Sequence, residues 1–282
     1  NGNPAFHPSG EYIVFTAEKP ESPSENKEWG VPGTGFNCDL WVVSRGGVFH
    51  RLTDYPLQRP YRAVIHPTFS HDGTKLLWAE RIGPGESFGG EWVLKIADFS
   101  TVEGRARLVD AKTLTPGNGP CFYESHDFSP DDRYILFSGN LLKGQPATGL
   151  DIYEMELSTG RITRLTATKD DWDEHAHYSP DGSRIIWMSS TGLSIQWGDT
   201  RGHSWRKFLK TELWIMKRDG TNQTQLTFFN TPGHPHNKLL NGNRFVVSDS
   251  AWSPDGRRIA ALVAYETPNG DIRASIVMLQ LN

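Results

Sequence analysis

The sequence is poor in cysteine, in long apolar runs and in excess charge of either sign. Cys38 and Cys121 are the only cysteines among 282 residues, which excludes CxxC metal or redox motifs and leaves at most one internal disulfide. The longest apolar run, residues 259–265, is far shorter than the ~20 residues that span a bilayer, so we expect no transmembrane segment. The 29 basic and 33 acidic residues are too evenly balanced for an electrostatic nucleic-acid binder.

Helical periodicity is also missing, because no long segment repeats apolar residues at a spacing of 3.6. The 28 glycines and 18 prolines suit a chain of short strands and tight turns. A hydrophobic content of 37% with 11% aromatic residues excludes a disordered chain. The composition therefore predicts an all-β globular protein.

One unit occurs five times along the chain. Each copy starts with an aromatic anchor, continues as a Ser-Pro-Asp-Gly-like segment and leads into a run typical of a β-strand. Proline presets φ, aspartate can bond its own backbone and glycine tolerates positive φ, so this segment predicts a tight turn between two antiparallel strands. The five anchors are Phe6, Phe69, Phe128, Tyr178 and Trp252.

Two more strands follow each turn, and we name the four strands of a unit a to d. Strand c is expected at residues 39–44, 91–99, 151–157, 212–218 and 274–281. Strand d often ends in Leu-Thr, at Thr53, Thr166 and Thr227, and the last unit lacks a recognisable strand d. Repeated four-stranded antiparallel units predict β-propeller blades. The predicted blades span about 4–53, 66–110, 126–166, 176–227 and 250–282, within a single domain over 1–282.

This unit resembles the TolB-like (WD-like repeat) β-propeller repeat, and the resemblance covers essentially the whole chain. Similar modules occur in TolB, in prolyl-oligopeptidase-type peptidases and in oligogalacturonate lyases. The resemblance implies a TolB-like β-propeller with five recognisable blades, or a six-bladed ring if upstream residues are missing. It identifies the fold and leaves the function open, because one fold hosts many functions.

The long connections are expected at one end of the blades. Strands alternate in direction, so the a–b and c–d turns share one face and the b–c and d–a loops share the other, which we call the long-loop face. The turns on the first face are all short, whereas loops at residues 19–37, 110–125, 191–211 and 228–249 fall on the long-loop face. Loops longer than ~12–15 residues are usually functional or disordered, so this face is the predicted working surface.

Histidines and carboxylates gather where long loops lead into strand a, near the predicted mouth of the central channel. His175 and His177 are two apart in an extended segment, which predicts that both side chains point to the same side. Imidazole and carboxylate groups suit a divalent ion such as Zn or Mn, with His126, His175 and His177 as its nitrogen ligands. The alternative is that these groups bond loop backbone and water. The predicted cluster comprises Glu124, His126, Asp173, Glu174, His175 and His177.

Oligogalacturonate lyases are similar in placing a His-rich metal site in a propeller channel. Their pattern includes a Gln three residues before a His-x-His pair. Trp172 stands three residues before His175, and Thr231 stands three residues before His234. The resemblance therefore does not carry over at this residue.

Basic and aromatic residues interleave in residues 201–210, in the b–c loop of the fourth blade. Trp205 and Arg206 in this segment would suit an acidic, saccharide or protein partner, because Trp and Arg often anchor interfaces. The alternative is a solvated loop whose Trp205 packs on the blade. His234 and His236, in the next long loop, complete the predicted ligand-binding residues.

The sequence lacks a Gly-x-Ser-x-Gly nucleophile elbow, a phosphate-binding loop and a His-Glu-x-x-His zinc motif. Our leading prediction is a non-catalytic, periplasmic or secreted scaffold that binds a protein or a polar or saccharide ligand through the long-loop face. The alternative is a metal-dependent carbohydrate-active enzyme, oligogalacturonate-lyase-like, that uses the His cluster. A divalent metal ion is the one cofactor that the sequence suggests.

Overall fold

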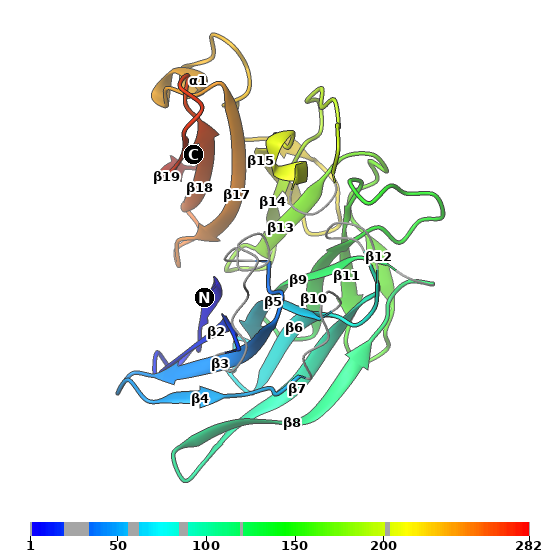
Figure 1. The fold of residues 1–282 in the computed structure, drawn as a ribbon, viewed down its shortest axis with the longest axis vertical. Coiled ribbons are helices and arrows are strands. Elements are labelled where there is room, and N and C mark those ends of the chain that lie inside the picture. Colours follow the sequence, from blue (N-terminus) through cyan, green and yellow to red (C-terminus); the bar gives the residue numbers. More distant parts are fainter. Residues whose placement is uncertain are drawn as a thin grey trace. The chain divides into compact units, whose positions relative to one another are not determined.

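The computed structural model describes residues 2–19, 34–55, 62–84, 90–118, 121–200 and 204–281, and Figure 1 labels its elements. In these residues the regular structure is almost entirely β, with one short helix, α1 (Pro235–Leu239), and one 3-10 turn, η1 (Ser204–Lys207). No helix in the described segments is long and apolar enough to cross a membrane. The thiols of Cys38 and Cys121 are both free.

The strands form five antiparallel sheets that follow one another along the chain. The first contains β1 (Gly2–Phe6), β2 (Tyr12–Glu18), β3 (Cys38–Ser44) and β4 (Phe49–Arg51). The second contains β5 (Ala63–Phe69), β6 (Lys75–Arg81), β7 (Trp92–Val102) and β8 (Arg105–Leu114). The third contains β9 (Tyr123–Phe128), β10 (Tyr134–Gly139), β11 (Asp151–Glu156) and β12 (Ile162–Arg164). The fourth contains β13 (Asp173–Tyr178), β14 (Arg184–Ser189), β15 (Glu212–Lys217) and β16 (Thr224–Gln225). The fifth contains β17 (Arg244–Trp252), β18 (Arg258–Glu266) and β19 (Ile272–Gln280).

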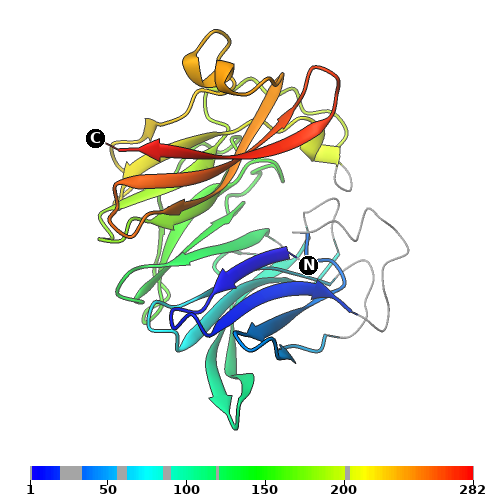
Figure 2. The ribbon, with the colours of Figure 1, turned by 90° about the vertical axis from the view of Figure 1, so that its left-hand side faces the viewer.

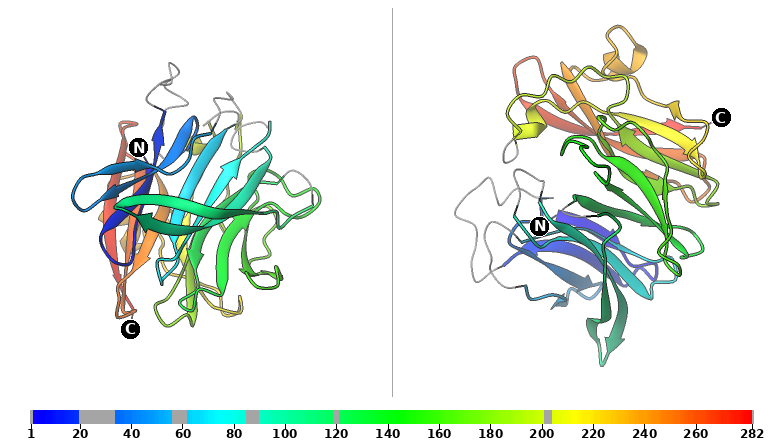
Figure 3. Two further views of the ribbon diagram at one scale, coloured as in Figure 1. Left: turned by 90° about the horizontal axis from the view of Figure 1, so that it is seen from below. Right: turned by 90° about the vertical axis from the view of Figure 1, so that its right-hand side faces the viewer.

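The predicted fold class is confirmed, since each sheet contains the strands of one repeat in chain order. Four sheets have the four strands a to d, whereas the described part of the fifth has three, with β19 outermost (Figure 3, orange to red). β19 pairs with β18 over nine residue pairs without a bulge. Ile276 and Met278 on β19 are 66% and 57% exposed.

By internal contacts the chain divides into two compact units, each described by itself below. The first contains Asn1–Ile135 and Glu156–Arg161, and the second contains Leu136–Met155, Ile162–Thr200 and Ser204–Asn282. The assignment of 1–282 to a single domain stays a prediction.

The Ser-x-Asp part of the repeat builds the a–b turn through one hydroxyl. Ser179 Oγ donates to Asp181 Oδ1 at 2.6 Å and accepts from Arg184 N, the first amide of β14, at 2.9 Å. These contacts recur at Ser70, Ser129 and Ser253. Hydrogen bonds from Ser179 and from Ser183 lower the pKa of Asp181 to about 2. The motif is therefore structural, as predicted.

The Leu-Thr signature ties strand d to strand c. The hydroxyl of Thr53 accepts from Leu40 N, that of Thr166 from Ile152 N and that of Thr227 from Leu213 N, at 2.8–2.9 Å. Each amide belongs to strand c, directly after a buried carboxylate. That carboxylate is Asp39, Asp151 or Glu212.

Each unit has its own apolar core. Val14, Leu40, Leu76 and Trp78 lie in one buried cluster in the first unit. Two clusters lie in the second unit, one around Tyr178 and Trp187 and one around Phe245 and Val263. Among the anchors, Phe69, Phe128 and Tyr178 are buried. Trp252 is half-buried, and the side chain of Phe6 is 73% exposed.

Two predicted d–a loops are shorter than expected. β8 continues to Leu114, beyond the predicted blade end at 110, because Asp110 takes a positive φ of 53° at an irregularity and pairing with β7 resumes after it. Figure 2 shows this long β7–β8 hairpin in teal. Similarly, β17 starts at Arg244, so the predicted 228–249 loop ends six residues earlier. The b–c loop bounds at 19–37 and 191–211 fit the strand ends, although residues 20–33 and 201–203 lie outside the described residues.

Candidate functional site

A β-bulge interrupts strand a at the same place in the first, second, fourth and fifth repeats. The register shifts in β1, β5, β13 and β17, in each case around the residue three positions before the anchor. Three of those residues have a positive φ of 48–52°, which is uncommon for a non-glycine residue. A bulge re-aims side chains, and this position is polar in every repeat. It holds Asn3, His66, Ser125, His175 and Asp249.

In the first unit, His66 at this bulge position lies close to the predicted residue Glu124, which in turn lies close to His126. His66 Nε2 lies 3.0 Å from Asn3 Nδ2 and 3.6 Å from Glu124 Oε1. His126 Nδ1 lies 3.9 Å from the same Glu124 oxygen, and the side chains of both residues are buried. Ser125 Oγ donates to the carbonyl of His66 at 2.8 Å. The side chains of Asn3, Ser125 and His126 thus converge on His66 and Glu124.

In the second unit, Glu174 and His175 have different surroundings. Glu174 is buried and accepts a hydrogen bond from Trp172 Nε1, while His175 Nδ1 lies 3.2 Å from Asp249 Oδ1. Burial raises the pKa of Glu174 to about 7, against the opposing effects of His175 and of the Trp172 hydrogen bond. The predicted residues Glu174 and His175 therefore gain Asp249, a partner that the sequence analysis did not select.

Asp173 and His177 lie elsewhere in the same strand. Asp173 is fully buried, and it accepts hydrogen bonds from Thr168 Oγ1 at 3.1 Å and from Trp187 Nε1 at 3.3 Å. Burial raises its pKa to about 7. The carbonyl of His177 accepts from Trp252 Nε1 at 3.3 Å. A bulge between Glu174 and His177 interrupts the regular strand on which the alternation argument relied, so the shared side of His175 and His177 stays a prediction.

Glu124 and His126 belong to the first unit, whereas Glu174, His175 and His177 belong to the second. Their convergence on one site therefore stays a prediction.

Three tryptophans hold the b–c loop of the fourth sheet. The Trp172 ring is buried and stacks on Trp205, with centroids 4.8 Å apart and planes at 25°. Trp197 lies 5.9 Å from Trp172, so tryptophans from two parts of the loop pack on it. A Cβ atom at Gly198 would lie 2.5 Å from the Phe208 ring, which shows how closely the loop packs on itself. Trp172 therefore anchors this loop.

The first residue of β17 fixes the other side of the same segment. Arg244 Nη1 donates to the carbonyls of Arg206 at 2.8 Å and Leu209 at 3.0 Å. The Arg206 side chain itself is exposed on η1. Trp205 and Arg206 thus lie in a loop whose backbone is held by tertiary contacts.

His234 and His236 accept hydrogen bonds from backbone amides. His234 Nδ1 accepts from His236 N at 3.1 Å, and His236 Nδ1 accepts from Phe228 N at 3.2 Å. A neutral imidazole with an accepting Nδ1 carries its proton on Nε2. Burial, aided by the neighbouring His234, lowers the pKa of His236 and favours this neutral form. Both rings therefore offer Nε2–H donors to a ligand while they hold the loop.

Comparison with known proteins gives limited sequence similarity. No protein-family model matches the chain. A stretch of 125 residues is 28% identical to the Tol-Pal system protein TolB of Francisella tularensis subsp. mediasiatica and covers 44% of this chain. The match spans only 25% of the length of that relative.

Similarity to solved structures extends over nearly the whole chain. A structure assigned as TolB from Agrobacterium tumefaciens matches 99% of this chain and 81% of its own, with a TM-score of 0.58 and 16% identity. An oligogalacturonate lyase in complex with manganese matches 100% of this chain and 65% of its own, with a TM-score of 0.54 and 14% identity. At such identities the likeness shows the fold alone. Together with the repeated antiparallel sheets, these comparisons show that the chain is a TolB-like β-propeller.

Proposed function

We propose that this propeller is a binding scaffold that recognises a protein or a polar ligand through loops of its fourth and fifth sheets. The observation that carries the proposal is the described part of one loop, residues 190–200 and 204–211. Its backbone is held by Arg244 and its tryptophans stack on Trp172, while Arg206 and Lys207 remain exposed. A binding loop that is already ordered loses little conformational entropy when a partner binds.

The chemistry of these loops suits a polar partner with acceptor groups. Arg206, Lys207 and Lys238 are exposed, and His234 and His236 offer Nε2–H donors. Half-buried Trp205 adds an aromatic surface beside Arg206, and both residue types are common in interface hot spots. The likeness to TolB favours a periplasmic or extracellular location for such a scaffold.

Binding to defined arrays of glycans and peptides tests this proposal. We expect a double variant, Arg206→Gln with Lys207→Gln, to lose the interactions of the wild type. Lys217→Gln is the control, because exposed Lys217 lies at the end of β15 beside the β15–β16 turn, at the opposite end of the same sheet. Equal binding by the double variant and the wild type would contradict the proposal.

A second candidate function, a metal-dependent carbohydrate-active enzyme, is favoured by the geometry in the first unit. Nitrogens of His66 and His126 lie 3.6 and 3.9 Å from one Glu124 oxygen. Two ligand atoms that are each ~2.1 Å from one ion can be at most ~4.2 Å apart, so Glu124 and one of the two histidines fit a shared Zn ion. In this case His66 is an alternative to the predicted ligand His126, while His175 and His177 stay proposed ligands from the second unit.

Metal content of the purified protein, together with a melting curve in Zn, Mn and Ca, tests this candidate. A bound ion must raise the melting temperature by mass action, and His126→Ala should abolish the rise. Cleavage of uronate-containing oligosaccharides would establish activity. An unchanged melting temperature in all three ions would exclude a metal-dependent enzyme at this site.

A further inference from the structure

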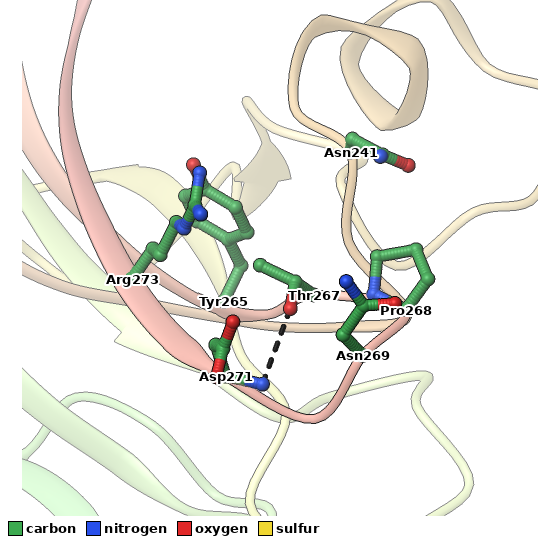
Figure 4. A pocket seen from close by; sticks show the side chains of 7 residues that line it. All are labelled: Asn241, Tyr265, Thr267, Pro268, Asn269, Asp271 and Arg273. Atoms are coloured by element: carbon green, nitrogen blue, oxygen red, sulfur yellow. Dashed lines mark hydrogen bonds between the residues drawn. The ribbon is translucent and has the colours of Figure 1, made fainter.

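A small pocket opens at the tip of the fifth sheet, on its b–c side (Figure 4). Its volume is about 170 Å³, and it is lined by the β18–β19 turn, by the two strands next to it and by Asn241 from the preceding loop. Tyr265 and Arg273 are direct partners across β18 and β19. The b–c turn and the d–a loop thus meet there, the two kinds of connection that define the long-loop face.

The rim of the pocket is held by a hydrogen-bonded turn. Thr267 N donates to the carbonyl of Asp271 at 2.8 Å, and Asp271 N donates to Thr267 Oγ1 at 3.1 Å. Gly270 adopts a φ of 85°, which glycine tolerates without strain, and its amide bonds to the carbonyl of Thr267. The turn that carries Asn269 and Asp271 is therefore defined before any ligand binds.

The aromatic wall is equally fixed. Tyr265 stacks with buried Phe245 at a centroid distance of 6.0 Å and an angle of 26°. Gly242 lies against both rings, since a Cβ there would be 2.9 Å from Phe245 and 3.1 Å from Tyr265. This close approach seats the neighbouring Asn241 at the edge of the pocket.

Several polar groups of the pocket are not used by the protein. Within the described segments, no hydrogen bond or ion pair engages the side chains of Asn241, Asn269 or Arg273. The Asp271 carboxylate is likewise unpaired there, since this residue bonds through its backbone. Figure 4 shows these side chains around the opening, with Tyr265 beside Arg273. The pocket thus offers amide and guanidinium donors together with amide and carboxylate acceptors.

We propose that this pocket binds one neutral sugar residue of a saccharide ligand, an inference that rests on the proposed binding function of the long-loop face. A sugar hydroxyl both donates and accepts, so it can use the mixed donors and acceptors around Arg273 and Asp271. The opposite charges of these two residues favour a neutral ligand over an anionic one. A volume of about 170 Å³ corresponds to five or six water molecules at ~30 Å³ each, which suits a single sugar ring and is below the ~300 Å³ of drug-sized pockets.

A sugar titration of the whole chain, followed by amide NMR, tests the proposal. The sugars are D-glucose, D-galactose, D-mannose and N-acetylglucosamine. We expect at least one sugar to shift the amides of residues 267–273, with a Kd of about 1 mM, because a dozen ligand atoms yield only ~4 kcal/mol. Arg273→Gln and Asn241→Ala should each weaken binding about tenfold, which corresponds to the loss of one charge-assisted or two neutral hydrogen bonds. Arg257→Gln, at the opposite end of the same sheet, is the control and should bind as the wild type does.

The proposal is overturned if no sugar shifts the NMR signals of these amides. It is also overturned if both pocket variants bind as tightly as the wild type while well-dispersed spectra show that they are folded. The proposed function fails separately. Unchanged array binding by the Arg206→Gln, Lys207→Gln double variant contradicts the scaffold surface whether or not the pocket binds sugar. Sugar binding that disappears in Arg273→Gln and persists in Arg257→Gln supports the pocket by itself.

Discussion

Arg244→Met should loosen the b–c loop of the fourth sheet without unfolding the second unit. The Arg244 guanidinium donates to the carbonyls of Arg206 and Leu209, and it lies 3.3 Å from Glu266. The Arg206 carbonyl and the Glu266 carboxylate are accessible to water, so we count only the partly buried bond to Leu209. A hydrogen bond from a charged group is worth about 1.5–3 kcal/mol, which corresponds to a ~10–150-fold change in an opening equilibrium.

Hydrogen exchange measures this effect directly. The amides of Phe208 and Leu209 bond to the carbonyl of Trp205 and report on the loop, whereas the amides of β14 report on the sheet. We expect exchange at Phe208 and Leu209 to accelerate ~10–150-fold while β14 changes little, because local opening needs less free energy than global unfolding. Arg218→Met, which removes a bond to Glu154 in the same unit, is the control. Unchanged exchange at Phe208 and Leu209 would refute the argument that Arg244 holds the loop.

Three further predictions concern the folded framework. Asp39→Asn should lower the free energy of unfolding by about 3–5 kcal/mol, because the Asp39 carboxylate pairs with the buried Lys19 ammonium at 2.5 Å and with Arg51 at 2.6 Å, and Lys19 would keep only the exposed Asp54 at 3.5 Å. In denaturant titrations, adding Lys19→Met should recover part of that loss, and strictly additive costs would contradict the pairing. Burial raises the pKa of the Cys38 thiol to about 12, so at pH 8 only ~1 in 10,000 Cys38 side chains is a thiolate. Alkylation of Cys38 should therefore be far slower in the folded protein than in the denatured chain, and equal rates would contradict this prediction. Amides of β19 should exchange faster than those of β11, because β19 is the outermost strand of the described fifth sheet, and equal protection in an isolated monomer would contradict this prediction.

The blades could be predicted because their defining contacts are local in sequence. Ser179 bonds Asp181 two residues away, and Thr166 bonds strand c of its own sheet, so the same short patterns recur wherever the same contacts are needed. The end of β8 could have been found in the same way, because Leu114 and Thr115 repeat the Leu-Thr signature.

The candidate site was harder to predict because candidates were chosen by residue type. Asn3, His66 and Asp249 stand three residues before their anchors, a position that is polar in every repeat. Comparing equivalent positions would have selected them. The acceptor roles of His234 and His236 have no such signal, because they depend on where the loop backbone folds back onto the rings.

The central claim is that the loops of the fourth and fifth sheets form the binding surface. Photo-crosslinking in cells that express the protein tests this claim most directly. A photoreactive residue replaces Lys207 in the loop in one variant and Asn222 in the β15–β16 turn in the other. The account predicts discrete adducts from position 207 that excess unlabelled protein competes away, and none from position 222. Adducts from position 222 alone, or equal adducts from both, would contradict it.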